Sequence, residues 1–202
     1  MQVFNADEVA MSKVLIVYGT TYGQTAKISD FISNELQRLK HTTEVYDSET
    51  IPSWVTPDTY DAILLGGSVI SGGYQRPLLK WIKKNSLLLA KKPSAFFSTC
   101  LGILQQDEAV KQEEIKLVKD LFFRTNWYPQ LWTIFAGSLL YTKYNWLVRR
   151  VMRRISKKAG GETDMSHDFE YTNWDDVQKF VRDFSTQLTF IQITGSASPK
   201  PH

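Results

Sequence analysis

The sequence predicts an α/β protein with a doubly wound parallel sheet of five strands. Two observations predict this class. Short apolar segments rich in β-branched residues alternate with segments whose apolar residues recur at helical spacing, and several strand-like segments run directly into loops of small residues. Strands that alternate with helices are joined by right-handed crossovers, so helices should cover both faces of the sheet. One domain is expected, because 202 residues suffice for a single core and the chain has no internal repeat.

The first expected strand, Val14–Tyr18, is apolar throughout and ends at Gly19 in a hydroxyl-rich loop that opens a helix. Backbone N–H groups and the positive end of a helix dipole favour an anion there. The loop contains no lysine and matches neither G-x-x-x-x-G-K-[ST] nor G-x-G-x-x-G, so a single phosphate, as in a flavin mononucleotide, is the expected ligand. The alternative is a capped turn without a ligand. The candidate phosphate residues are Thr20, Thr21, Tyr22, Gly23, Gln24 and Thr25.

The remaining elements follow in alternation. After the first helix, whose apolar stripe runs from Ile28 to Leu39, the expected strands are Thr43–Tyr46, Ala62–Leu65, Ala95–Thr99 and Leu131–Ala136. Three further helices are expected: one that starts at Pro77, one over Asp107–Phe123 and one that starts near Thr172. Thr172 and Asp175 have the spacing of a capping box, with Asp in place of Glu. We expect an extension over residues 1–12, the domain over 13–188 and a flexible tail over 189–202.

Three loops should meet at one edge of this sheet. In the strand order 2-1-3-4-5, the ligand site lies at the carboxyl ends of the first and third strands, where the order reverses. The loops concerned are Gly19–Thr25, Gly66–Tyr74 and Ser98–Gly102. The second loop, GGSVISGGY, is glycine-rich, which lets backbone approach a flat ring, and its Tyr74 could stack on that ring. The alternative is a flexible surface loop.

Composition limits the classes of function. The single cysteine, Cys100, excludes an intrachain disulfide and multi-cysteine metal sites and favours a reducing compartment, and the three histidines have no metal-binding spacing. His41 is expected away from the ligand edge, and His167 follows the insertion described below; neither is expected to be catalytic. No signal or transit peptide is evident. The uncharged stretch Thr125–Thr142 contains Pro129 and Gly137 and is interpreted as a buried strand with its approaches.

A basic insertion separates the fifth strand from the last helix. Gly137–Tyr171 is about 35 residues long where a short connection would suffice. Within it, Tyr141–Lys158 carries seven basic and no acidic residues, which leaves a formal −4 for the rest of a chain of net charge +3. As a helix this stretch would be amphipathic, suited to an anionic membrane surface or to an acidic substrate. An ordinary helix with a solvated basic face is the alternative, and nucleic-acid binding is not favoured.

Several motifs in order resemble the oxygen-independent, flavodoxin-like protoporphyrinogen oxidases. They are GTTYGQT from Gly19, GGSVISGGYQ from Gly66, PSAFFST from Pro93, AGSLLYTKYNW from Ala136, GGETD from Gly160 and YTNW from Tyr171. The resemblance covers roughly Lys13 to Leu188. It implies a flavodoxin-like fold, FMN as cofactor, and oxidation of protoporphyrinogen IX to protoporphyrin IX in haem biosynthesis, with menaquinone or ubiquinone as acceptor. It also implies peripheral attachment at the cytoplasmic face of a membrane, or mitochondrial association in a eukaryote.

The resemblance also assigns residues. Besides the phosphate loop, the residues implied near the flavin are Ser68, Val69, Gly72, Tyr74, Ser98, Thr99, Cys100, Leu101, Gly102 and Asp164. Those proposed for substrate carboxylates or lipid phosphates are Arg149, Arg150, Arg153 and Arg154. Ile70 and Ser71 stand where members of the family carry a basic residue and an aromatic, so that loop supplies no cation here. No catalytic acid or base is assigned, and the oligomeric state is left open.

Three other functions are compatible with the sequence. An electron-carrier flavodoxin would present an acidic face, whereas this chain has a pI near 8.8. An FMN-dependent NAD(P)H:quinone reductase would use the same fold and would turn over quinone with a nicotinamide cofactor. A membrane-surface protein that has lost FMN is the least favoured, because the first loop is intact.

Overall fold

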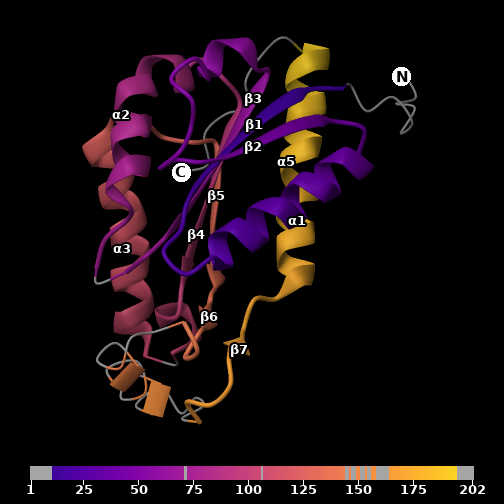
Figure 1. The fold of residues 1–202 in the computed structure, drawn as a ribbon. Helices are drawn as coiled ribbons and strands as arrows, with labels where there is room; N and C mark the ends of the chain where they lie inside the picture. Colours follow the sequence, from indigo (N-terminus) through magenta and orange to yellow (C-terminus); the bar gives the residue numbers. More distant parts are fainter. Residues whose placement is uncertain are drawn as a thin grey trace.

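The computed structural model describes residues 11–70, 72–105, 107–143, 146, 149, 150, 153, 156, 157 and 164–194. Five parallel strands form one sheet in the order β2-β1-β3-β4-β5, as predicted (Figure 1). The strands are β1 Lys13–Gly19, β2 Thr42–Asp47, β3 Ala62–Ser68, β4 Ser94–Cys100 and β5 Leu131–Ala136. The helices are α1 Gln24–Arg38, α2 Arg76–Leu89, α3 Glu108–Thr125 and α5 Trp174–Thr194, with short 3-10 turns η1 Pro57–Thr59 and η2 Gly102–Leu104. A small hairpin, β6 Ser138–Leu139 with β7 Phe169–Glu170, lies beyond the sheet.

Both faces of the sheet are buried, which explains why β1 reads as a continuous apolar run. Val14 and Ile16 point into a core cluster with α1 and α5, while Leu15 and Val17 point into a second cluster with α2 and α3. The two helix pairs are seen on opposite sides of the sheet in Figure 1. The stretch from 125 to 142 contains the end of α3, the fully buried Trp127 and strands β5 and β6. The expected strand is present, but it is not fully buried, because β5 lies at the edge of the sheet and only Phe135 in it is buried. No helix in the described part of the chain has the length and apolar character needed to cross a bilayer.

The start and end of the last helix differ from the prediction. The capping box is wrong: the side chain of Asn173, not Thr172, accepts the Asp175 N–H at 3.1 Å. The Thr172 hydroxyl instead donates to the Ala136 carbonyl oxygen at 2.8 Å, because Thr172 lies beside the end of β5 before the helix begins. At the other end, α5 continues beyond Leu188 to Thr194, into the range expected to be a flexible tail.

Candidate functional site

The loop after β1 leaves the start of α1 open to an anion. The N–H of Gly23 donates to the Thr20 hydroxyl at 2.9 Å, which folds the loop back on itself. Gly23 has a φ of 99°, a left-handed conformation that favours glycine, and no side chain in the described part of the chain caps the helix behind it. The first N–H groups of α1 are therefore available to a ligand such as a phosphate.

Gln75, at the end of the glycine-rich loop, ties two of the predicted loops together. Its side-chain amide donates to the Thr21 hydroxyl at 3.0 Å and to the Ser68 hydroxyl at 2.7 Å, and its oxygen accepts the Ser68 N–H at 3.3 Å. A Cβ at Gly19 would approach that oxygen to 2.8 Å, so a larger residue at this position would displace the Gln75 amide. Sequence reasoning did not assign Gln75 a role. Its place in the motif GGSVISGGYQ was the available signal.

Tyr74 packs against the sheet rather than projecting from its loop. Its hydroxyl donates to the Ser98 hydroxyl at 2.9 Å, and its ring meets Phe96 edge to face with centroids 5.8 Å apart. A Cβ at Gly67 would come within 2.7 Å of the Tyr74 ring. Burial raises the pKa of Tyr74 well above its usual value. Tyr74 therefore forms a wall of the site, and stacking on a bound ring remains a prediction.

The third loop joins the first through buried hydroxyl groups. The Thr25 and Thr99 hydroxyls are 3.0 Å apart, and both side chains are buried. Beyond Thr99, burial raises the pKa of the Cys100 thiol to about 12, and Glu114 on α3 is hydrogen-bonded to it. Burial also raises the pKa of Glu114, whose second oxygen has no hydrogen-bond partner among the described residues. No local pattern in the sequence points to Glu114, because the contact joins α3 to β4.

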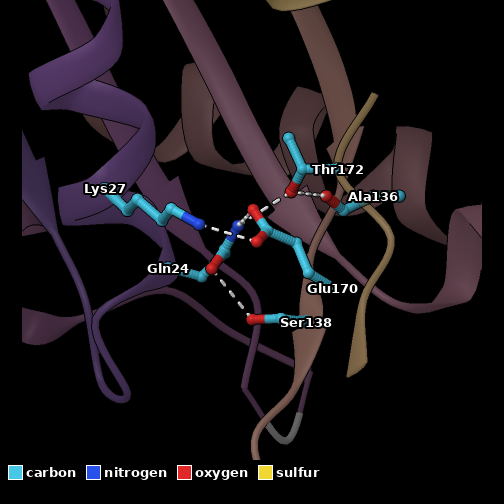
Figure 2. A network of polar contacts seen from close by, with 6 residues as sticks. All are labelled: Gln24, Lys27, Ala136, Ser138, Glu170 and Thr172. Carbon is cyan, nitrogen blue, oxygen red and sulfur yellow. Dashed lines mark hydrogen bonds and ion pairs between the residues drawn. The ribbon is translucent and has the colours of Figure 1, made fainter. Parts of the chain in front are cut away.

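A polar network fastens the β6–β7 hairpin to α1 (Figure 2). The Gln24 amide donates to Glu170 at 3.0 Å and to the Thr172 hydroxyl at 2.9 Å, while its oxygen accepts from the Ser138 hydroxyl at 3.0 Å. Lys27 forms an ion pair with Glu170 at 2.6 Å. The Gln24 side chain is thus engaged in holding the hairpin. Any contact of Gln24 with a phosphate would use its backbone N–H.

The hairpin also packs on two of the predicted cofactor loops. Leu139 and the fully buried Tyr141 form the centre of a separate apolar cluster. Tyr22 of the first loop and Leu101 of the third loop pack against it. From the same segment, Lys143 donates from Nζ to the Tyr22 carbonyl oxygen at 3.2 Å and lies 3.5 Å from where a Gly23 Cβ would stand. A cation that is absent from the loop sequence therefore reaches the loop in the fold.

The basic insertion is described only in part. Arg150, Arg153 and Trp146 are exposed and helical, and Arg149 is partly buried. Arg154 lies outside the described residues, as do residues 158–163 with most of the GGETD motif. Asp164 is exposed and accepts from the Ser166 N–H and hydroxyl and from His167, which lower its pKa to about 2. Its placement near a flavin stays a prediction.

A pocket of about 470 Å³ lies outside the three loops, at the edge of the sheet. It is lined by η2, by the free edge of β5 and by the first half of α5. Its lining includes the apolar side chains of Ile103, Leu104 and Phe180 and the charged side chains of Asp176, Lys179 and Asp183. The sequence did not predict this pocket, because it depends on how α5 packs beside the edge strand.

The residues at the carboxyl edge fit an FMN molecule. Hydroxyl groups of Thr20 and Thr21, N–H groups of α1 and the Lys143 ammonium are donors suited to a phosphate. A Cβ at Gly72, which has a φ of 77°, would meet no described atom within 4 Å, so backbone is open to a ring on that side. Ser68 and Val69 lie at the end of β3, Ser98 lies near the end of β4, and Gly102 begins the 3-10 turn that follows β4.

Comparisons with known proteins agree with this geometry. The family model "Flavodoxin domain" matches residues 15–166. The chain is 30% identical over 175 residues to protoporphyrinogen IX dehydrogenase (quinone) of Escherichia coli K12, covering 86% of this chain and 94% of that protein. It is 35% identical over 174 residues to the protein of the same name from Leishmania major, covering 86% of this chain and 74% of that one.

Among solved structures, oxidised flavodoxin 1 from Bacillus cereus superposes with a TM-score of 0.51 at 16% identity, covering 90% of this chain and 98% of the flavodoxin. The apo form of the NADH:FMN oxidoreductase EMOB gives a TM-score of 0.51 at 10% identity, covering 93% and 92% of the two chains. At these identities the structural likeness establishes the fold. Together with the sequence matches, it shows that the chain is a flavodoxin-domain protein and belongs to the family of quinone-dependent protoporphyrinogen IX dehydrogenases.

Proposed function

We propose that this chain is an FMN-dependent enzyme that oxidises protoporphyrinogen IX to protoporphyrin IX and passes the electrons to a respiratory quinone. The observation that carries the proposal is the similarity to protoporphyrinogen IX dehydrogenases (quinone) over 86% of the chain. When bound, FMN would accept two electrons at a time from the substrate and deliver them to quinone, so three rounds remove the six electrons and six protons. The hairpin and its apolar cluster would limit access of water to the cofactor loops.

The chain's own residues would position the cofactor and exclude solvent. Thr20, Thr21 and the first N–H groups of α1 would hold the phosphate, since they lie in the loop that precedes α1 and at the end of the helix where its dipole is positive. Gln75 would fix the spacing of the first two loops. The loops ending β3 and β4 would border the ring, with Tyr74 as a wall. We assign no side chain as catalytic acid or base.

The basic insertion would meet an acidic partner. Arg149, Arg150 and Arg153 can bind carboxylates bidentately, which suits the substrate's propionates, and can equally bind lipid phosphates. Quinones partition into membranes, so an exposed basic segment bearing Trp146 would place the enzyme at an anionic membrane surface. Attachment would be peripheral, on the cytoplasmic face.

The test is an anaerobic assay of the FMN-loaded protein with protoporphyrinogen IX and a menaquinone or ubiquinone analogue, followed by porphyrin fluorescence. We expect fluorescence that depends on both protein and quinone and exceeds autoxidation in controls lacking either one. A yellow, FMN-loaded protein without this signal would overturn the proposal. Quinone reduction driven by NADH or NADPH would then indicate a nicotinamide-linked quinone reductase, and no turnover with either donor would indicate an electron carrier.

A further inference from the structure

We propose that Lys143 is the cationic contact of the FMN phosphate, so that the insertion completes the cofactor site. This inference rests on the proposed function, because it assumes that the loop after β1 holds FMN. The loop itself, residues 20–25, contains no basic residue. In the fold a cation reaches it from a position 121 residues away in the sequence.

The contact places the ammonium group beside the open start of α1. Lys143 Nζ donates to the Tyr22 carbonyl oxygen at 3.2 Å and stands 3.5 Å from an ideal Cβ on Gly23, the residue that precedes α1. An ammonium group has three donors, and the carbonyl uses one. Two remain for a phosphate bound at the first N–H groups of the helix. The helix dipole and the ammonium charge therefore act on the same anion.

The backbone that carries Lys143 is fixed from the far side of the insertion. Asp168 accepts the Thr142 N–H at 2.9 Å and the Thr142 hydroxyl at 2.7 Å, and the Lys143 N–H donates to the Leu140 carbonyl oxygen at 2.9 Å. The fully buried ring of Tyr141 anchors the same turn in the apolar cluster. Asp168 is therefore a positioning residue for Lys143.

Among the residues that the structure describes, Lys143 is the cation directed at this loop. Lys27, one turn into α1, is paired with Glu170 at 2.6 Å. The first turn of α1 contains no acidic residue that would repel a phosphate. Glu170 is neutralised by Lys27, and the negative charge of Asp168 is countered by Lys143 and Arg149, so neither carboxylate stands near the helix start as an uncompensated charge.

The test compares FMN with riboflavin, which lacks the phosphate. Dissociation constants of both flavins are measured by fluorescence quenching on the full-length apoprotein, for the wild type, Lys143→Gln and Lys143→Arg. Glutamine keeps a donor for the Tyr22 carbonyl but removes the charge. We expect Lys143→Gln to weaken FMN binding about tenfold, with riboflavin binding unchanged and a smaller salt dependence of FMN affinity. Lys143→Arg should restore most of the FMN affinity.

Two controls separate this inference from its premises. Lys116→Gln removes the same charge from the exposed side of α3 and should leave both affinities unchanged. Asp168→Asn should weaken FMN binding less than Lys143→Gln does, again without affecting riboflavin. Equal loss of both flavins in Lys143→Gln, or no loss of either, would overturn the role of Lys143 while leaving FMN binding intact. If the wild type bound neither flavin, that result would instead contradict the proposed function, which requires FMN.

Discussion

At the scale of single residues, buried titratable groups distinguish structural positions from cofactor contacts. His41 is 3% exposed and lies between the end of α1 and α5, away from the three loops. Its Nδ1 accepts the Ser12 N–H at 3.2 Å, so the proton of the neutral ring is on Nε2, which donates to the Ser185 hydroxyl at 2.8 Å. The ring joins β1, α1 and α5, and this explains its burial without a catalytic role.

His41 should make stability depend on pH. Burial lowers the pKa of His41, so the unfolded chain takes up the proton first as pH falls. The stabilising contribution is complete above about pH 6.5 and is lost progressively below it. We expect the free energy of unfolding, measured by urea titration from pH 8 to 5.5, to fall less steeply in His41→Gln. That variant should lose about 1–3 kcal/mol at pH 8.

His167→Gln is the control for loss of an exposed histidine, and its urea titration is compared over the same pH range. Glu44, whose pKa is held at about 2 by Lys13, Tyr60 and Tyr46, affects stability only at more acidic pH, so it does not interfere with this range. Identical slopes in the wild type and His41→Gln would refute the prediction.

Glu114 should make stability depend on pH in the opposite direction to His41. Burial raises the pKa of its carboxyl, so the folded state holds the proton more tightly than the unfolded one. Its contribution is favourable at acidic pH and is lost as pH rises through the unfolded value of about 4.5 towards the higher folded one. We expect Glu114→Gln to raise the melting temperature by about 2 °C at pH 7.5 and to show no gain at pH 4. Asp120→Asn, which removes an exposed charge of α3 that does not act on Glu114, should show no such difference.

At the scale of elements, the β6–β7 hairpin is joined to the domain by two kinds of contact. The Lys27–Glu170 pair is exposed, with side chains 57% and 34% accessible, so it contributes about 1 kcal/mol or less. Tyr141, in contrast, is fully buried in the apolar cluster with Tyr22 and Leu101. The apolar cluster should therefore dominate docking of the hairpin.

Comparing Tyr141→Ala with Glu170→Gln tests this ranking. Truncating a buried aromatic costs about 3–5 kcal/mol, and here the cost falls on the hairpin, because its cluster is separate from the two clusters of the sheet. We expect Tyr141→Ala to increase amide exchange and proteolysis around residues 138–143 and 168–172, with a small change in the melting of the sheet. Glu170→Gln should have little effect on local exchange and proteolysis or on the melting of the sheet. A global loss of stability in Tyr141→Ala would show that the hairpin belongs to the main core.

At the scale of the whole molecule, charge is divided between two parts. Seven basic residues lie between 141 and 158, and the rest of the chain carries a formal −4. A cation near an anionic bilayer contributes about 1 kcal/mol, and salt screens that attraction. The insertion would thus bring the carboxyl edge of the sheet, where the flavin loops meet, towards the membrane.

Vesicle sedimentation tests whether the insertion binds an anionic membrane surface. The variant Arg149→Gln/Arg150→Gln/Arg153→Gln should lose most binding to vesicles containing phosphatidylserine, and neutral phosphatidylcholine vesicles should bind no variant strongly. The matched control is Lys80→Gln/Lys83→Gln/Lys84→Gln, which removes three exposed charges from α2. Wild-type binding should fall as NaCl rises. Equal losses in the two triple variants would mean that net charge, not the insertion, determines attachment.

The sequence by itself determined the five strands and the three loops at their carboxyl ends. The strand order followed from the resemblance of its motifs to those of flavodoxin-like proteins. These signals are local: apolar runs, helical spacing and glycine-rich turns act between neighbours in the chain, and β5 was predicted with its observed bounds. The capping box at Thr172 failed because a nearby strand end, Ala136, offered that hydroxyl a better partner.

Only the tertiary structure decided which side chains complete the site. Gln24 and Glu170 are 146 residues apart, Lys143 and Tyr22 are 121 apart, and the Cys100–Glu114 contact joins a strand to a helix. Gln75 likewise meets Thr21 across two strand ends. No local pattern encodes such pairs, because they exist only once the sheet has brought its strand ends together and the hairpin has docked on them.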